Sequence, residues 1–364
     1  MKIELLVGAD EFWERMREDL VGARDSAYIQ TFSFEGDRVG IRLGRALRDS
    51  TAKDRRLLVD SYSRLYHSDR VIPGPSWRDR SLRREVKLTH RWIARLREDE
   101  VGVRFGNPLG PSPLRLVRRS HKKLAAFDGR VVYLGGINFS DHNFAWHDMM
   151  LRVESPELAE LAAEDFRSSW EGRPTAFDRE VGSLRLISLN GRGNRAGFQP
   201  VIEAIDQARY TIDVVSAYLS HPFTDFLARA RRRGVRVRVL MPGENNKSNL
   251  ARHILERAVR GGFEVLRYPG GMSHMKAMTV DGELLVMGSS NFDFMSYHIL
   301  EEHVVMTRDR ALVDAYMDRV WRPDAASAHV EPVRSSIGTR LGDLAVRIGA
   351  AVASSLALTQ GETT

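Results

Sequence analysis

The segment SHKKLAAFDGRVVYLGGINF (120–139) returns later in the chain as SHMKAMTVDGELLVMGSSNF (273–292). Both copies contain Ser-His-x-Lys, then Asp-Gly, an apolar run, a glycine and Asn-Phe, and they align without a gap. A long motif that recurs with unchanged internal spacing indicates that the chain contains two copies of one structural unit.

The sequence upstream of each copy follows one order of elements. In the first half, residues 27–37 and 55–62 have the apolar character of strands, and residues 40–50 between them have helical spacing. In the second half the corresponding segments are 210–220, 235–243 and, between them, 223–234. Strands that alternate with helices predict an α/β fold, here duplicated as two mixed-sheet α/β halves.

The halves are expected to divide in the Gly-, Pro- and Arg-rich region 172–196. We expect an N-terminal half with the first motif at 1–172, a C-terminal half with the second motif at 173–325, and an amphipathic helical tail at 326–364. Residues 64–97, which are rich in Arg, Pro and Trp, are expected to be an insert in the first half alone.

The amino-acid composition limits the class of protein and the kinds of active site that the chain can have. Hydrophobic residues make up 43% of the chain and charged residues 28%, as in folded globular proteins, and the net charge of +7 favours contact with phosphates. The chain has no cysteine, which excludes disulfides, thiolate metal sites and cysteine nucleophiles. We expect no signal peptide, and no membrane span because no stretch reaches about 18 apolar residues.

Each copy of the motif is expected to form a hairpin. Side chains alternate along a strand, so His121 and Lys123 project to one side of a strand over 120–127. Asp128-Gly129 is a strong turn signal, and the return strand ends at Gly135-Gly136 with Asn138 just beyond. The second copy has the equivalent residues His274, Lys276, Asp281, Gly288 and Asn291.

These residue types suit the cleavage of a phosphodiester. Two lysines neutralise the non-bridging oxygens, one neutral imidazole attacks phosphorus, and a second, protonated imidazole donates a proton to the leaving oxygen. The ordinary histidine pKa of about 6.5 suits both roles near neutral pH. A carboxylate hydrogen-bonded to an imidazole fixes its tautomer. This chemistry requires no metal and no cofactor.

The pattern His-x-Lys-x-x-x-x-Asp, followed by Gly-Gly or Gly-Ser and Asn, resembles the signature of the phospholipase D superfamily. The resemblance implies a duplicated fold whose two halves pack about a pseudo-twofold axis. It also implies that one histidine forms a covalent phosphohistidine and that the other is the general acid. The catalytic residues it implies are His121, Lys123, Asp128, His274, Lys276 and Asp281.

Within this superfamily the chain is most similar to bacterial cardiolipin synthases of the soluble type. Trp146-His147-Asp148 resembles their Trp-Arg-Asp, and the segment 291–302 resembles their Asn-x-Asp-x-Arg-Ser-x-x-x-Asn-x-Glu. Met295 and Leu300 depart from that pattern, which expects Arg and Asn. The residues expected to bind the substrate phosphate or to support the site are Asn138, Asn291, Gly136, Ser289, Arg119, Asp148 and Glu302.

The carboxylate partner of the second half has two candidates. Asp148 and Glu302 are the expected partners of the two imidazoles. Glu301 competes with Glu302, because it follows Asn291 at the same spacing at which Asp148 follows Asn138.

The resemblance implies transfer of a phosphatidyl group between molecules of phosphatidylglycerol or a similar phospholipid. A hydrolytic phospholipase D is the close alternative, and a superfamily nuclease or an inactive lipid-binding scaffold are the others. Two motifs in one chain and the presence of both aspartates argue against a nuclease, so nucleic acid is not an expected partner. Intact His and Lys in both copies argue against a scaffold.

The tail carries apolar residues at helical spacing, namely Ile337, Leu341, Leu344, Ile348, Val352 and Leu356. This pattern is typical of a helix at a lipid interface, and equally of a helix packed on the protein itself or on a second subunit. We expect a cytoplasmic protein that binds peripherally to the inner face of the membrane.

Overall fold

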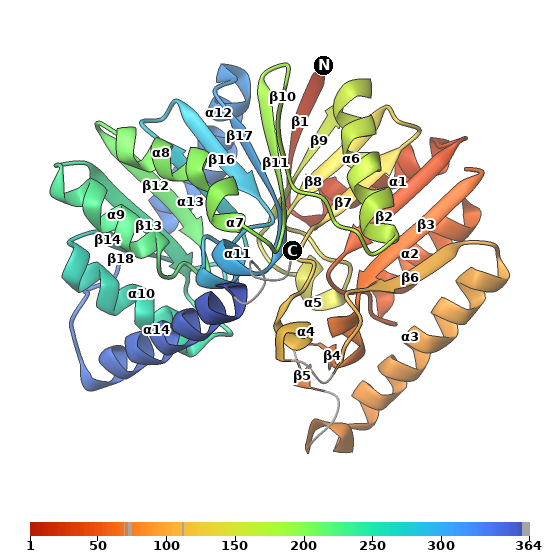
Figure 1. Cartoon of the computed structure of the whole chain (residues 1–364), viewed down its shortest axis with the longest axis horizontal. Coiled ribbons are helices and arrows are strands. Elements are labelled where there is room, and N and C mark those ends of the chain that lie inside the picture. The colour runs from red at the N-terminus through yellow and green to blue at the C-terminus, as the bar shows by residue number, and fades with distance from the viewer. Residues whose placement is uncertain (69, 72–74, 111–112, 359–364) are drawn as a thin grey trace. The chain divides into compact units, whose positions relative to one another are not determined.

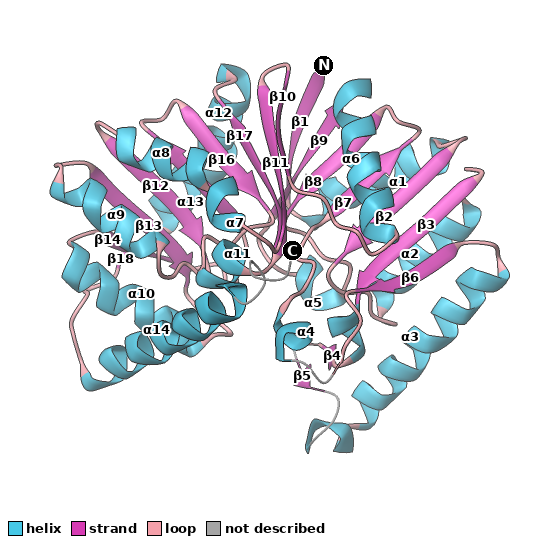
Figure 2. Cartoon of the chain, viewed as in Figure 1, coloured by secondary structure: helices cyan, strands magenta, loops and turns pink. Residues whose placement is uncertain are grey.

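The computed structural model describes residues 1–68, 70–71, 75–110 and 113–358. The chain divides into two compact units, Met1–Thr175 and Ala176–Thr364 (Figure 1). Each unit is built on one large mixed β-sheet covered by helices (Figure 2).

The sheet of the first unit has seven strands in the order β1-β9-β8-β7-β2-β3-β6. Their bounds are β1 (Lys2–Val7), β2 (Ser26–Thr31), β3 (Asp54–Asp60), β6 (Gly102–Gly106), β7 (Leu124–Phe127), β8 (Val131–Gly135) and β9 (Met149–Glu154). Strands β2, β3 and β6 run parallel, and the other neighbours are antiparallel.

The sheet of the second unit has nine strands in the order β10-β11-β17-β16-β15-β12-β13-β14-β18. Their bounds are β10 (Phe177–Val181), β11 (Leu184–Asn190), β12 (Thr211–Ser216), β13 (Arg236–Pro242), β14 (Glu264–Tyr268), β15 (Lys276–Val280), β16 (Leu284–Gly288), β17 (Glu301–Thr307) and β18 (His329–Val330). Strands β12, β13 and β14 run parallel.

Without its edge strands β10 and β18, the second sheet has the strand order and directions of the first. In this correspondence β7–β8 and β15–β16 are the hairpins of the repeated motif. The predicted α/β fold with two mixed sheets is therefore confirmed.

Helices follow the strands in the same alternation in both units. The helices of the first unit are α1 (Ala9–Gly22), α2 (Arg38–Asp49), α3 (Arg80–Glu98), α4 (Pro113–Val117), α5 (Asp141–Phe144) and α6 (Pro156–Trp170). Those of the second are α7 (Asn194–Gly197), α8 (Gln199–Gln207), α9 (Phe223–Arg232), α10 (Ser248–Gly261), α11 (Phe294–His298), α12 (Arg310–Tyr316), α13 (Arg322–Ser327) and α14 (Ile337–Leu358).

The expected insert at 64–97 is only partly an insert. Helix α3 lies between β3 and β6, as α10 lies between β13 and β14, so most of this segment has a counterpart in the second half. The real difference is the connection before the helix, which is long at 61–79 and short at 243–247. The long connection contains the small hairpin of β4 (Tyr66–His67) and β5 (Arg70–Val71).

Alternating side chains give the first sheet two apolar faces. Ile29 of β2 and Leu57 of β3 belong to one buried cluster with Leu43 of α2. Tyr28, the neighbour of Ile29, points the other way and stacks on Phe166 of α6, with ring centroids 4.8 Å apart. Helices on both faces therefore hold the strand ends that carry the candidate site.

Candidate active site

In the first unit, His121 and Lys123 lie just before β7 rather than inside it. The sequence predicts a strand from Ser120, but regular pairing begins at Leu124. The Lys123 ammonium folds back and donates a hydrogen bond to the backbone carbonyl of His121 at 2.7 Å. Both side chains contact Phe32, whose ring centroid lies 5.4 Å from the His121 ring and 5.6 Å from Nζ of Lys123.

The carboxyl end of β2 positions this group. The Gln30 amide donates to the Ser120 hydroxyl at 2.9 Å, immediately before the histidine. The Thr31 hydroxyl lies 3.4 Å from Oδ1 of Asn138, in the loop that follows β8. One strand end thus connects the histidine segment to the asparagine.

The second unit repeats the arrangement with its own residues. Lys276 donates a very short hydrogen bond to the carbonyl of His274. The ring of His274 packs edge-on against Tyr218, with centroids 5.9 Å apart. Ser216, at the end of β12, donates to the backbone carbonyl of Asn291 at 2.7 Å. In each unit, therefore, a lysine binds the backbone carbonyl of the histidine and an aromatic ring contacts its imidazole.

Strand register decides between the two candidate carboxylates of the second half. Gly135 pairs with Met150 in the first unit, and Gly288 pairs with Val304 in the second. The residue two places before each partner is Asp148 in one case and Glu302 in the other. Glu302, not Glu301, is therefore the structural counterpart of Asp148, because the loop before β17 is one residue longer.

Both oxygens of Glu302 accept hydrogen bonds from serines. The Ser289 hydroxyl donates a very short hydrogen bond to Oε2, and the Ser296 hydroxyl donates to Oε1 at 2.7 Å. Asp293 caps the helix that carries Ser296 by accepting from its backbone N–H at 2.7 Å, and burial raises the pKa of Asp293 to about 6. The carboxylate is thus fixed in one orientation.

The first unit fixes Asp148 differently. Its Oδ1 accepts from the backbone N–H of Met149 at 2.8 Å. The position of Ser289 is taken by Gly136, and a Cβ there would lie 2.3 Å from Oδ1 of Asp148. A short carboxylate beside a glycine therefore replaces a long carboxylate beside a serine.

Arg119 was expected to bind the phosphate or to support the site, and its contacts are those of a supporting residue. Its buried guanidinium donates to Oδ1 of Asp60 at 3.2 Å and to the backbone carbonyl of Asn107 at 2.8 Å. Asp60 also accepts from the Ser120 backbone N–H at 2.7 Å, and burial raises its pKa to about 6 even though Arg119 opposes the shift. Arg119 therefore anchors the segment that leads into His121.

The expected catalytic role of Asp128 and Asp281 does not fit their positions. Each lies at the end of its hairpin strand opposite to the histidine, on the order of 20 Å away along an extended chain. Asp128 accepts from the backbone N–H groups of residues 24–26 at 2.8–3.1 Å, and Asp281 accepts from those of 209–211 at 2.7–2.9 Å. We assign both aspartates a structural role.

The backbone conformation of the hairpin turn explains why an aspartate suits this position. Asp128 and Asp281 have φ of +52° and +55°, and the glycine after each also has positive φ, as a tight hairpin turn requires. Burial would raise the pKa of Asp128, but backbone N–H donation from Ser26, Arg24 and Asp25 outweighs it, so the pKa lies below its usual value. The pKa of Asp281 is lowered in the same way.

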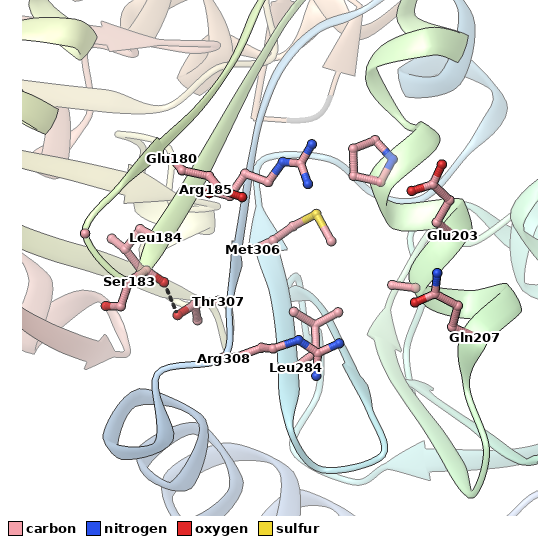
Figure 3. A pocket seen from close by; sticks show the side chains of 13 residues that line it. Glu180, Ser183, Leu184, Arg185, Glu203, Gln207, Leu284, Met306, Thr307 and Arg308 are labelled. Atoms are coloured by element: carbon pink, nitrogen blue, oxygen red, sulfur yellow. Dashed lines mark hydrogen bonds between the residues drawn. The ribbon is translucent and has the colours of Figure 1, made fainter.

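A pocket of about 370 Å³ lies in the second unit (Figure 3). Met306, Thr307 and Arg308 line it at the end of β17 opposite to Glu302. The Thr307 hydroxyl donates to the carbonyl of Ser183 at 2.7 Å on one wall. Among the described residues that line this pocket there is no predicted site residue, so we do not assign it to the chemistry.

Sequence reasoning missed the residues that support the motif from outside it. Phe32, Asp60 and Tyr218 contact the two motif copies but belong to other strands or loops. Asp60 was detectable as a lone acid at the end of the apolar strand RRLLVD (55–60). Phe32 directly follows β2, and Tyr218 lies two residues after the end of β12, positions that the strand pattern alone does not mark as functional.

The sequence of the chain matches a known protein family over most of its length. The family described as "Cardiolipin synthase, PLD-like domain" matches residues 16–170 and 201–322, more than half of the chain. The chain belongs to this family. It is a phosphodiester transferase of the phospholipase D superfamily, and at the level of the family the reaction is phospholipid phosphatidyl transfer.

Individual relatives agree with the family. Cardiolipin synthase A of Pseudomonas fluorescens (strain SBW25) is 27% identical over 95% of this chain and 73% of its own length. Cardiolipin synthase B of Escherichia coli (strain K12) is 24% identical over 85% of this chain and 77% of its own length. The fold is similar to that of phosphatidylserine synthase from Haemophilus influenzae Rd KW20, with a TM-score of 0.69 at 14% identity, over 97% of this chain and 94% of that one.

Proposed function

We propose that the chain transfers a phosphatidyl group between phosphatidylglycerol molecules, or similar lipids, through a covalent phosphohistidine. One imidazole, of His121 or His274, attacks phosphorus while the other, protonated, gives its proton to the departing head-group oxygen. The second imidazole then takes a proton from an acceptor hydroxyl, whose oxygen attacks phosphorus and releases the histidine. With two phosphatidylglycerol molecules the products are cardiolipin and glycerol.

The observation that carries this proposal is the repeated local geometry. Each unit offers one histidine and one lysine, Lys123 or Lys276, whose ammonium binds the backbone carbonyl of that histidine at the same strand end. Two units thus supply the two imidazoles and two ammonium groups that the reaction requires. Asp148 and Glu302, which register makes equivalent, are the groups we propose to orient the imidazoles.

Either a lipid hydroxyl or water can accept the phosphatidyl group. A product assay distinguishes the two reactions. Purified protein is incubated with phosphatidylglycerol vesicles in EDTA, and the lipids are identified by mass spectrometry. We expect cardiolipin and glycerol in equal amounts. Phosphatidic acid as the main product would make the chain a hydrolase, and cleavage of single-stranded DNA without any lipid product would overturn the proposal.

Helix α14 presents its large apolar side chains to solvent. Ile337 is 79% exposed and Leu341 is 60% exposed, and the exposed apolar row continues through Leu344, Ile348, Val352 and Leu358. The opposite face has smaller buried residues, including Gly342, where a Cβ would lie 2.6 Å from Cβ of Arg252 on α10. In the described residues α14 is also the one helix long and apolar enough to cross a membrane.

Polar contacts hold α14 against the second unit. Thr339 donates to Glu256 of α10 at 2.7 Å, and Arg195 donates to Ser354 at 2.6 Å. A helix fastened along one face, with an apolar row on the other, suits adsorption in the plane of a membrane. We therefore propose that α14 binds the lipid surface, at the cytoplasmic face, where anionic lipid attracts this basic chain.

Vesicle binding tests the role of α14. Leu344→Asp combined with Ile348→Asp should lower binding to phosphatidylglycerol vesicles by at least about a hundredfold, because each buried aliphatic side chain contributes about 1.5–3 kcal/mol. Val21→Asp, at an exposed apolar position of α1, is the control and should bind like the unmodified protein. Equal vesicle binding by the α14 variant would exclude this helix as the attachment site.

A further inference from the structure

A second group of ionisable side chains lies in the first unit, outside the histidine and lysine pairs. Glu35 follows β2, His67 belongs to β4 and Glu85 to α3. One ligand atom from each of the three lies within 4.8 Å of the others. Glu35 and His67 are buried and Glu85 is half-buried. Two enclosed carboxylates so close together require a neutralising partner.

The His67 imidazole faces these carboxylates with one nitrogen unsatisfied. Its Nδ1 lies 3.4 Å from Oε1 of Glu85, but the angles are not those of a hydrogen bond, and Nδ1 has no other partner. The side chain is only 3% exposed. Buried polar nitrogens are normally satisfied, so this atom points to a ligand.

Neighbouring groups hold the two carboxylates in place. Ser68 donates from its backbone N–H to Glu35 at 3.1 Å and from its hydroxyl to both oxygens of Glu85 at 3.1 Å. Gly36 lies so close to α3 that a Cβ would come within 2.3 Å of the backbone nitrogen of Thr89. Such supporting contacts orient the ligands of metal sites.

We propose that Glu35, His67 and Glu85 bind a divalent first-row cation such as Zn²⁺. An imidazole nitrogen with carboxylate oxygens suits Zn²⁺ or Mn²⁺, whereas Mg²⁺ and Ca²⁺ prefer oxygen ligands alone.

The cation joins three segments near the first histidine. Its ligands come from the loop after β2, the long connection 61–79 and α3. That connection also carries Tyr62, which stacks on Phe32 at 5.2 Å, and Phe32 contacts His121. The role is structural, because the cation fastens the connection and does not touch phosphorus. The inference therefore stands independently of the proposed lipid transfer.

Metal binding is measured on the full chain without lipid. The protein is stripped with EDTA, incubated with Zn²⁺, desalted, and analysed for bound metal and for Tm. We expect about one Zn²⁺ per chain and, at a hundredfold excess over Kd, a Tm rise of about 5 °C or more. Glu85→Gln and His67→Gln should each lose both effects. Glu98→Gln, an equal change of charge at an exposed site of α3, should keep them.

Two outcomes would overturn the proposed cation site. Absence of bound Zn²⁺ and of a Tm shift in the unmodified protein would show that the cluster is not a cation site. Full Zn²⁺ binding by both variants would place the metal elsewhere. If Glu85→Gln fails to fold, His67→Gln and the stoichiometry of the unmodified protein decide the question. The lipid assay is performed in EDTA, so its result does not depend on this one.

Discussion

The direction of single side chains decides which motif residues belong to the reaction. In the sequence, Asp128 looks like a third member of the group formed by His121 and Lys123. The strand between them carries the aspartate to the opposite end of the hairpin, where backbone N–H groups surround it. The hairpin and its Asp-Gly turn could be predicted from the sequence, although the strand begins at Leu124 and not at Ser120. The role of Asp128 could not, because the sequence does not show what lies beside the turn.

Replacing the motif aspartates should affect stability rather than turnover. Asp128→Asn loses a charged acceptor of several backbone N–H groups, so the free energy of unfolding should fall by about 1–3 kcal/mol. Transfer activity per folded molecule should remain within about threefold of the original. Denaturant unfolding and a lipid assay on the same sample measure both. A large loss of activity in fully folded protein would restore the catalytic assignment.

The lowered pKa of Asp128 predicts how the stability of the fold changes at acidic pH. Its pKa in the folded protein lies below the ordinary value of 3.8, so the ionised carboxylate stabilises the fold above that pH. This contribution is lost as the pH falls through the lower, folded-state pKa. Between about pH 5 and pH 2, Asp128→Asn should therefore lose less stability than the original chain does. Parallel loss in the two proteins would contradict the hydrogen-bond account.

The two histidines carry the chemistry in our account. His121→Ala and His274→Ala should each lower kcat/KM for phosphatidyl transfer by at least about a thousandfold, because each removes either the nucleophile or the acid. Circular dichroism should show folded protein in both cases. Substantial turnover by either variant would exclude the two-histidine mechanism.

At the scale of elements, strand register favours Glu302, the residue expected from the sequence, over its competitor Glu301. The sequence spacing favours Glu301, whereas the pairing of β16 with β17 makes Glu302 equivalent to Asp148. One additional residue in the preceding loop causes the difference, and a single sequence does not reveal it. For the same reason the counterpart of α3 was mistaken for an insert, since the two connecting loops differ greatly in length.

A pair of conservative variants tests this register. Glu302→Gln should lower kcat by at least about a hundredfold, because a neutral amide orients an imidazolium poorly. Glu301→Gln should lower it by less than about tenfold. Initial rates on phosphatidylglycerol vesicles measure both variants. The reverse order of effects would assign the catalytic role to Glu301.

At the scale of the whole molecule, the duplication could be read directly from the repeated segment. The two mixed sheets and the placement of one histidine in each unit follow from it, whereas the strand order comes from the structure. The outward apolar row of α14 could not be predicted, because the same spacing suits a buried helix. Small residues on the other face, including Gly342, allow the close contact with α10 that turns the large ones outward.

The covalent intermediate tests the central claim most directly. His121→Ala and His274→Ala are each mixed with phosphatidylglycerol that carries a radiolabelled phosphate, quenched in alkali and analysed by peptide mapping. The variant that keeps the nucleophile should retain acid-labile label on its remaining histidine, and the other variant should retain none. Absence of label from both variants, or label on any other residue, while the unmodified chain makes cardiolipin, would contradict a phosphohistidine mechanism.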